Sequence, residues 1–407
     1  MTLALLVGHG FNYALILGAN RILDSGGFGL FYTAVLAITV AVAPVMAITF
    51  VLARRFADVN AQFGQAQVTA MTRRVLVLCA RWGVPIAVAV GIALTLAGPW
   101  FDIDAWPLAL LIALAVLVLG VAEVLRAAFQ GMLLFGWSSA LWITSQAAQF
   151  ALAIGGLLLF TRVWTGVAGI LAGGAFACAA FAPWFVPTLR GRASERSVHV
   201  PLTLRRELPM IASYSLFILL NNLDILVGYW LLPRAALDVY AASALLPKAI
   251  ITATFPVAQV VLPVIVDQRL DGISSRLSVL KAVAMVVAMS VPAALVLWAV
   301  VPLAQATPFA IRGLDFSIMT MLAAGAVALS ALRILVVVEV ALRRYAFGLA
   351  QAGAVVLFLV LCARADIRAH GIAELYTIVS WGFLVTAIAT LFLARTRFSG
   401  LIRSQQQ

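Results

Sequence analysis

Long apolar stretches separated by short polar loops follow one another almost without a break along the 407-residue chain. A helix needs roughly 20 consecutive apolar residues to cross the hydrocarbon core of a bilayer. The pattern therefore predicts an all-α polytopic membrane protein with about twelve transmembrane helices. These helices are expected to begin near Thr2, Phe28, Val75, Pro107, Gly136, Gly166, Pro209, Leu237, Leu277, Phe316, Tyr345 and Ile372.

The two halves of this pattern repeat each other at a spacing of about 212 residues, since Phe28 recurs as Tyr240 and Pro44 recurs as Pro256. Internal repeats of this kind are typical of secondary transporters, whose binding site lies near the bilayer midplane where the repeats meet. An even number of helices per half gives both halves the same orientation. We therefore expect two pseudo-symmetric six-helix bundles around a central cavity.

The repeat predicts an N-terminal lobe at 1–188, a cytoplasmic inter-lobe linker at 189–208 and a C-terminal lobe at 209–407 with a short basic tail. Proline inside a membrane helix removes a backbone donor and bends the helix, so the paired Pro44 and Pro256 are candidate hinges, or sites of ordinary helix curvature. Gly169 and Gly173 have the spacing of small residues that allow two helices to pack closely.

Arginine is concentrated in one set of loops, which includes Arg54-Arg55, Arg73-Arg74, Arg343-Arg344 and the linker. Cytoplasmic loops retain basic residues, so both termini are expected in the cytoplasm. The segment from Phe56 to Arg74 mixes polar and apolar residues and is expected to lie on the membrane surface. The first helix lacks a basic leading segment and a cleavage site, which favours a transmembrane helix that stays in the protein over a signal peptide that is removed.

The composition excludes several classes of protein. Hydrophobic residues make up 64% of the chain and charged residues 10%, far from the values of a soluble domain. The net charge of +12 is spread over short loops, which argues against a nucleic-acid partner. No P-loop sequence is present, and the three cysteines lie in apolar spans without a metal-binding spacing. We expect neither a cofactor nor a metal.

Charged residues inside apolar spans are costly and usually mark a pathway through the protein. Asp224 and Lys248 are predicted at similar depth in neighbouring helices, where they form either a structural ion pair or a site that responds to ions. His9 and Asn12 occupy the corresponding part of the first half, and the spacing of three residues places them on one helix face. The alternative interpretation of His9 is a packing residue whose ring nitrogens are hydrogen-bonded within the protein.

Several motifs resemble the polysaccharide-flippase branch of the multidrug, oligosaccharidyl-lipid and polysaccharide exporter superfamily. They are the run from Asp224 to Leu232, the turn Val239-Tyr240-Ala241-Ala242, Arg21-Ile22-Leu23 before Phe28-Gly29, and Leu125-Arg126 through Phe135-Gly136. The resemblance covers nearly the whole chain. It implies two six-helix lobes in the bacterial cytoplasmic (inner) membrane that move lipid-linked oligosaccharides to the periplasmic leaflet. It also implies membrane lipids, a polysaccharide polymerase and glycosyltransferases as partners.

A flippase of this kind receives a diphosphate, and arginine forms bidentate bonds to phosphate oxygens. Arg21, Arg126, Lys248 and Arg333 are therefore predicted to bind anionic groups, although snorkelling toward the lipid head groups also accounts for Arg126 and Arg333. Gln146 and Gln149 are predicted to contact sugar hydroxyls or to join helices. Asp224 is the leading candidate for ion coupling, followed by Glu123, which also has the spacing to pair with Arg126, and then by His9 and Asn12.

Two other functions fit parts of the same pattern. A multidrug exporter of the same superfamily would share the fold, but an interior rich in arginine suits an anionic cargo better. A membrane-embedded glycosyltransferase would use acidic residues at the periplasmic face, where Asp102 and Asp104 are predicted to lie. Two carboxylates without a periplasmic domain are weak evidence for catalysis. A transporter that works by alternating access is therefore the preferred interpretation, and not an enzyme.

Overall fold

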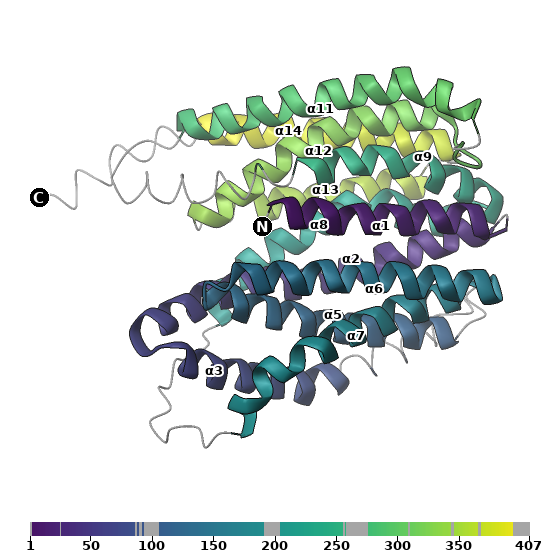
Figure 1. Ribbon diagram of the computed structural model, residues 1–407. Coiled ribbons are helices and arrows are strands. Elements are labelled where there is room, and N and C mark those ends of the chain that lie inside the picture. Colours follow the sequence, from purple (N-terminus) through teal and green to yellow (C-terminus); the bar gives the residue numbers. More distant parts are fainter. Residues whose placement is uncertain are drawn as a thin grey trace, which may run out of the picture. The chain divides into compact units, whose positions relative to one another are not determined.

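A computed structural model describes residues 2–24, 26–85, 106–190, 204–254, 276–307, 310–342, 346–364 and 368–393, together with 88, 92 and 257. Among these residues the structure contains helices and no strand (Figure 1). The helices of the first half are α1 (Thr2–Ile22), α2 (Gly27–Phe63), α3 (Gln65–Leu78), the π-helical turn η1 (Cys79–Gly83), α5 (Trp106–Gly131), α6 (Phe135–Phe160) and α7 (Val163–Arg190). Those of the second half are α8 (Leu204–Leu231), α9 (Arg234–Ala253), α11 (Arg276–Gln305), α12 (Phe316–Leu342), α13 (Ala346–Arg364) and α14 (Ala369–Leu393).

Ten of the described helices are long and apolar enough to cross a membrane. The chain is therefore a multi-pass membrane protein. Two of the twelve predicted spans differ from the rest. The one expected near Tyr345 is a shorter apolar helix, Gly348–Arg364. The one expected near Val75 belongs to a helical segment that begins earlier, at Gln65, and whose continuation lies outside the described residues.

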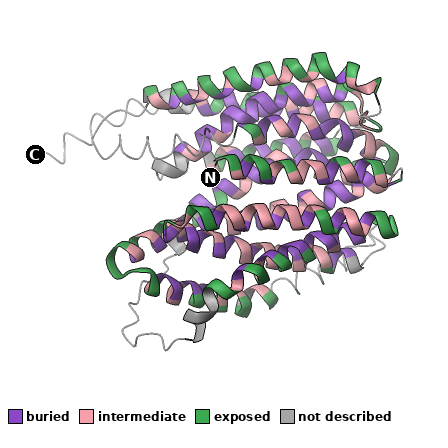
Figure 2. Ribbon diagram, in the orientation of Figure 1, coloured by how far each residue is buried: buried purple, intermediate pink, exposed green. Residues whose placement is uncertain are grey.

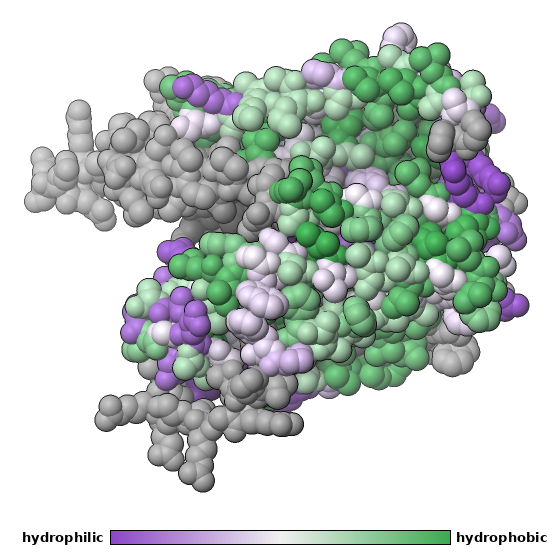
Figure 3. Space-filling model, in the orientation of Figure 1, coloured by the Kyte–Doolittle hydropathy of each residue, from purple (hydrophilic) through white to green (hydrophobic). Residues whose placement is uncertain are grey.

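Large apolar side chains cover the outer faces of the helices, as expected where a protein meets lipid tails (Figure 3). The helices of one unit differ strongly in this respect. In the most apolar stretch of α11 only 11% of the residues are buried, whereas in the corresponding stretch of α12 the share is 78%. Figure 2 shows this contrast, with α11 largely exposed and α12 largely buried. Within this part of the chain, α12 is therefore a core helix and α11 is a helix at the lipid boundary.

The second helix is longer than the sequence pattern predicts. It continues through Pro44 to Phe63 and ends at Gly64, whose φ of 80° interrupts the helix. At about 1.5 Å per residue its 37 residues extend about 55 Å, well beyond the hydrocarbon core of roughly 30 Å. The prediction of a surface segment from Phe56 to Arg74 is therefore wrong at its start, because Phe56 belongs to α2 and is fully buried.

Contacts between Cα atoms divide the chain into two compact units. Unit 1 contains residues 1–218, 232–242 and 311–313, and unit 2 contains residues 219–231, 243–310 and 314–407. In unit 1 the main helix pairs are α6 with α7, α2 with α5, α1 with α6 and α5 with α7. A Cβ atom at Gly169 would clash with the backbone of Ala153, and one at Gly173 with the backbone of Gln149. The predicted close packing at these two glycines is confirmed.

Besides the first part of α8, two short segments from the second half, 232–242 and 311–313, also belong to unit 1. The Asn20 side chain donates to the carbonyl of Arg312 (3.2 Å) and accepts from its amide (3.0 Å). The Asp238 carboxylate accepts from the amides of Gly26 and Gly29 at the start of α2. Gly26 adopts a φ of 91°, which suits glycine. The turn between α1 and α2 is thus held by residues more than 200 positions away.

Unit 2 is organised around α12, which packs against α11 and α14, while α13 packs against α14. Asp315 precedes α12 and accepts from the amides of Ser317 (2.8 Å) and Ile318 (3.1 Å), which caps the N-terminus of this helix. The lobes at 1–188 and 209–407 remain predictions, because the two compact units do not test them. Most of the predicted linker lies outside the described residues, between Arg190 and Leu204.

Candidate functional site

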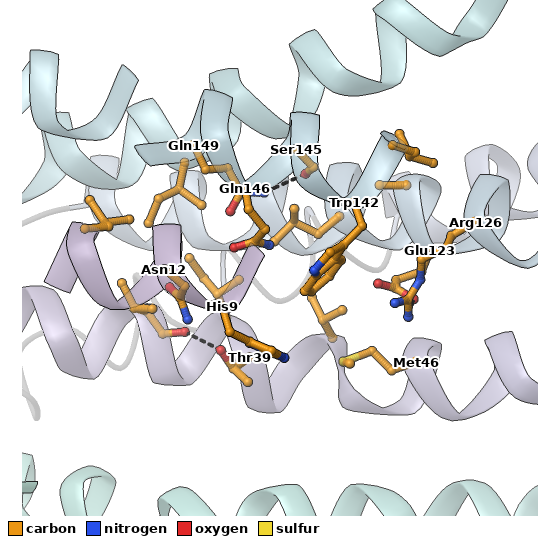
Figure 4. Close-up of a pocket in the computed structure, with 18 residues that line it drawn as sticks. His9, Asn12, Thr39, Met46, Glu123, Arg126, Trp142, Ser145, Gln146 and Gln149 are labelled. Atoms are coloured by element: carbon orange, nitrogen blue, oxygen red, sulfur yellow. Dashed lines mark hydrogen bonds and ion pairs between the residues drawn. The ribbon is translucent and has the colours of Figure 1, made fainter. Parts of the chain in front are cut away.

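Five helices of unit 1 enclose a cavity of about 190 Å³, which we call the N-terminal cavity (Figure 4). Its lining combines apolar residues with polar side chains that lie far apart in the sequence. The polar and aromatic residues of the lining are His9 and Asn12 from α1, Thr39 from α2, Glu123 and Arg126 from α5, and Trp142, Ser145, Gln146 and Gln149 from α6. Six of these are residues that the sequence singles out: His9, Asn12, Glu123, Arg126, Gln146 and Gln149.

One end of the N-terminal cavity is charged. Arg126 forms an ion pair with Glu123, one helical turn before it, as their spacing predicts. The guanidinium carbon of Arg126 lies 5.1 Å from the centre of the Trp142 ring, a cation–π distance. The buried Nε atom of Arg126 has no hydrogen-bond partner among the described residues. This end therefore holds a partly buried guanidinium whose buried Nε retains an unused donor.

Trp142 separates the charged end from the rest of the cavity (Figure 4). Its indole meets the His9 ring edge to face, with ring centres 5.7 Å apart. A Cβ atom at position 8 would clash with the indole Nε1, so glycine at this position makes room for the ring. The Nε1 atom of Trp142 is buried and has no hydrogen-bond partner in the described part of the chain. Trp142 thus lines both ends of the cavity.

The other end of the cavity has no permanently charged side chain and is rich in amides. Asn12, Gln146 and Gln149 face it from α1 and α6 (Figure 4). Gln149 donates to the hydroxyl of Ser145 at 2.8 Å, which orients its side chain. Side-chain amides carry both donors and acceptors, so this end can match the mixed donors and acceptors of a hydroxyl-rich molecule.

A second group of predicted residues comes together in unit 2. The ammonium of Lys248 lies 2.9 Å from Oδ1 of Asp224, so the predicted pairing of these two residues is confirmed. Lys248 also donates to the carbonyl of Asn221 and lies 5.6 Å from the centre of the Tyr376 ring. The Tyr376 hydroxyl donates to the same carbonyl at 2.9 Å. The adjoining space has a volume of only about 10 Å³, about enough for one water molecule.

The remaining predicted site residues occupy other positions. Arg333 in α12 donates from Nη1 to the carbonyl of Ile251 at 3.1 Å, close to the Lys248 group. Arg21 is exposed at the end of α1, and its carbonyl accepts from Nη1 of Arg312. Pro44 lies within α2, whereas Pro256 lies outside the described residues, as do Asp102 and Asp104. The roles assigned to these residues remain predictions.

Sequence reasoning missed two aromatic residues, Trp142 and Tyr376. A usable signal existed for the first one, because Trp142, Gln146 and Gln149 share one helix face at a spacing of four and three residues. Within an apolar span, however, an aromatic residue has the same pattern whether it faces lipid or a cavity. Tyr376 carries no such signal, because its partners come from other helices.

The comparison of known structures identifies the fold. A multidrug-resistance MATE family transporter of the MOP superfamily, in an inward-facing conformation, has a TM-score of 0.70 at 13% identity, over 97% of this chain and 95% of that one. The MATE transporter VcmN of Vibrio cholerae has a TM-score of 0.66 at 16% identity, over 96% and 95% of the two chains. The lipid II flippase MurJ has a TM-score of 0.67 at 12% identity, over 95% and 87%. This chain has the fold of these transporters.

The likeness is one of structure. No family model matches the sequence, and no curated protein sequence matches it. At identities of 12 to 16% the comparison shows the fold alone. The cargo has to be argued from the side chains that line the site.

Proposed function

We propose that this protein is a secondary transporter that moves a polyprenyl-diphosphate-linked oligosaccharide from the cytoplasmic to the periplasmic leaflet of the bacterial inner membrane, for polysaccharide biosynthesis. One observation carries the proposal. The N-terminal cavity places a partly buried arginine at one end and three side-chain amides at the other. A diphosphate joined to a sugar presents the matching groups in the same order, first anionic oxygens and then hydroxyls.

The chemistry of each end supports this assignment. Guanidinium groups bind phosphate oxygens through charge-assisted hydrogen bonds and keep their charge at all physiological pH values. Amide side chains donate to and accept from hydroxyl groups. The cavity volume of about 190 Å³ lies below the range of roughly 300 to 1,000 Å³ for drug-sized ligands. We infer that the cavity contacts part of the head group while the lipid tail stays in the bilayer.

In the proposed mechanism, two six-helix lobes expose the site alternately to the two sides of the membrane, with Pro44 and Pro256 as hinges. An ion gradient or the membrane potential supplies the energy, the latter about 2.3 kcal/mol per charge per 100 mV. Asp224 is the leading coupling residue and Glu123 the second, with His9 and Asn12 lining the same path. Arg21, Lys248 and Arg333 are assigned to successive contacts with anionic groups.

Reconstitution tests this function directly. The protein is inserted into liposomes that contain a lipid-linked oligosaccharide, and the share that reaches the opposite leaflet is measured with an enzyme that cleaves the exposed sugar. We expect translocation by the wild type, its loss in Arg126→Gln, and no change in Arg162→Gln, a control that alters an exposed arginine in the residue before α7. Translocation by Arg126→Gln at the wild-type rate would remove the N-terminal cavity from the proposal.

Export of cationic drugs is the second candidate function. Glu123 and Trp142 favour it, because a carboxylate beside an aromatic ring is a suitable site for an organic cation. The two functions make opposite predictions for one variant. Loss of the Glu123 charge should abolish export of a cationic dye, whereas it should leave an oligosaccharide flippase able to bind its diphosphate.

A further inference from the structure

The ion pair in the N-terminal cavity leaves part of its arginine unused. The guanidinium of Arg126 carries five N–H groups on three nitrogen atoms. One of these nitrogens, Nη2, donates to Glu123. The Nε atom is buried and has no hydrogen-bond partner among the described residues. A buried charge without a counter-ion is strongly unfavourable, and an unsatisfied buried donor adds a further cost. Glu123 therefore satisfies the charge of Arg126 but leaves hydrogen-bonding capacity for another acceptor.

We propose that Glu123 is a built-in counter-ion that competes with the anionic group of the ligand for Arg126. Glu123 neutralises the guanidinium through the observed ion pair. An incoming phosphate adds its own negative charge at the cavity end of Arg126, displaces Glu123 from Nη2, and bonds to the guanidinium in its place. The inference rests on the proposed function, because it requires an anionic ligand at this end of the cavity.

The residues around the ion pair make Glu123 the group that an anionic ligand displaces from Arg126. Of the described residues that line the cavity, Glu123 is the only acidic one and Arg126 the only permanently charged base; His9 is the one further titratable group. The lining residues that come from α2, α6 and α7 include no charged side chain. Two anions near a single cation repel each other, and in a buried site this repulsion is screened only weakly. The ligand's phosphate and Glu123 therefore compete directly.

This arrangement has a consequence for specificity. A neutral sugar lipid brings no charge that can replace Glu123, so it leaves the pair intact. A diphosphate carries enough charge and oxygen acceptors to hold the guanidinium through more than one hydrogen bond. Glu123 and Arg126 lie one turn apart on the same helix, so Glu123 can pair with Arg126 again as soon as the ligand leaves. Release of the ligand is thereby assisted by the protein's own carboxylate.

Binding measurements on the full-length protein in detergent test the inference. The probe is a prenyl diphosphate with a short chain, and the matched neutral probe is the corresponding prenyl alcohol. Isothermal titration gives the Kd of each probe for the wild type and for Glu123→Gln, Arg126→Gln and the double variant. We expect Glu123→Gln to bind the diphosphate at least about tenfold more tightly, as expected when a buried like charge is removed.

The other variants separate competition from a structural role. Arg126→Gln should lose most of the diphosphate affinity, and the double variant should behave like Arg126→Gln, because Glu123 acts through Arg126. The affinity for the prenyl alcohol should stay the same in Glu123→Gln. If Glu123→Gln does not fold, Glu123→Asp replaces it; a shorter side chain that weakens the pair should give a diphosphate affinity above that of the wild type.

Two results would overturn the inference in different ways. Diphosphate binding that is unchanged or weaker in Glu123→Gln, together with a loss in Arg126→Gln, would show that Glu123 only positions Arg126, and the proposed function would stand. No diphosphate binding by any variant, together with binding of a cationic dye that Glu123→Gln abolishes, would overturn the proposed function as well.

Discussion

Among the described residues, each compact unit has an ion pair with little exposure to solvent, and the two pairs differ in the space around them. Glu123 and Arg126 lie on one helix beside a cavity of about 190 Å³, and Nε of Arg126 has no partner among the described residues. Asp224 and Lys248 join α8 to α9, and the space beside them is only about 10 Å³. Asn221 and Tyr376 complete the surroundings of Lys248. A ligand can thus reach the first pair, whereas the second, which we call the enclosed pair, has room beside it in this conformation for about one water molecule. A ligand contact at Lys248 therefore requires this space to widen during transport.

This difference teaches that an intramembrane charge does not define a function by itself. A pair with room beside it is able to exchange one partner for a ligand, because the incoming group replaces the lost interaction. A pair without room holds two helices together, because breaking it leaves a charge uncompensated. We therefore expect substitutions in the enclosed pair to affect stability first, and substitutions around the N-terminal cavity to affect transport first.

The largest effect is expected for Asp224→Asn. This change leaves the Lys248 ammonium buried without its carboxylate and should lower the free energy of unfolding by about 3 to 5 kcal/mol. Thermal unfolding in detergent, followed by the loss of the monodisperse peak in size-exclusion chromatography, measures the change. An Asp224→Asn variant as stable as the wild type would show that the enclosed pair does not hold α8 and α9 together.

The double variant Asp224→Asn with Lys248→Met is the control for this prediction. It removes both charges, so much of the lost stability should return. Its transport activity addresses the proposed coupling role. Wild-type transport by the double variant would remove Asp224 from the mechanism, whereas a stable but inactive protein would support it.

A smaller loss of stability is expected for Gly173→Leu in α7. Its side chain would enter the space occupied by the backbone of Gln149, a residue that lines the N-terminal cavity. Overpacking of this kind costs about 1 to 3 kcal/mol, and here it should also displace α6. Gly155→Leu on α6 is the matched control, because no other part of the described structure lies within 4 Å of its Cβ position. Equal melting temperatures for the two variants would contradict the close packing of α6 and α7.

A change in transport with little change in stability is expected for Gly8→Ala in α1. The new methyl group would press on the Trp142 indole and shift the ring that separates the two ends of the cavity. We expect the initial rate of transport in liposomes to fall several-fold, since misplacing a positioning group by about 1 Å is costly. Gly10→Ala, two residues further along α1, meets nothing within 4 Å and should transport like the wild type. Full activity of Gly8→Ala would show that the position of Trp142 is unimportant.

The smallest effect is expected for Tyr376→Phe in α14. This variant keeps the ring near Lys248 but removes the hydroxyl that donates to the Asn221 carbonyl. The loss of one hydrogen bond should lower the free energy of unfolding by about 0.5 to 1.5 kcal/mol. Tyr376→Leu removes the ring as well and should cost more. If the two variants unfold at the same temperature, the aromatic ring does not stabilise the ammonium.

Much of the fold was accessible from sequence because lipid imposes simple rules on a chain. Each span needs a long apolar run with all backbone groups bonded internally, so ten of the predicted helices are described as such. Gly169 and Gly173 were recognisable as a packing surface because small residues at this spacing allow close approach. The long α2 was not predicted, since the polar residues near its end resemble a loop while Phe56 is buried by contacts with other helices.

The candidate site was predicted in part. Glu123 and Arg126 were paired correctly because they lie three residues apart on one helix, and Asp224 and Lys248 because both are charges at the same predicted depth. The grouping of His9 and Asn12 with Gln146 and Gln149 was not predictable, because it depends on the packing of α1 against α6. Trp142 and Tyr376 were missed for the same reason.

The sequence by itself determined the membrane spans, the repeated order of helices and the rare charges that interrupt them, because each of these depends on local composition and spacing. Only the tertiary structure decided which ion pair lies beside a cavity of about 190 Å³ and which has only about 10 Å³ beside it. That distinction depends on the volume left between helices, and this volume is set by side chains and glycines that meet across helix pairs far apart in the chain.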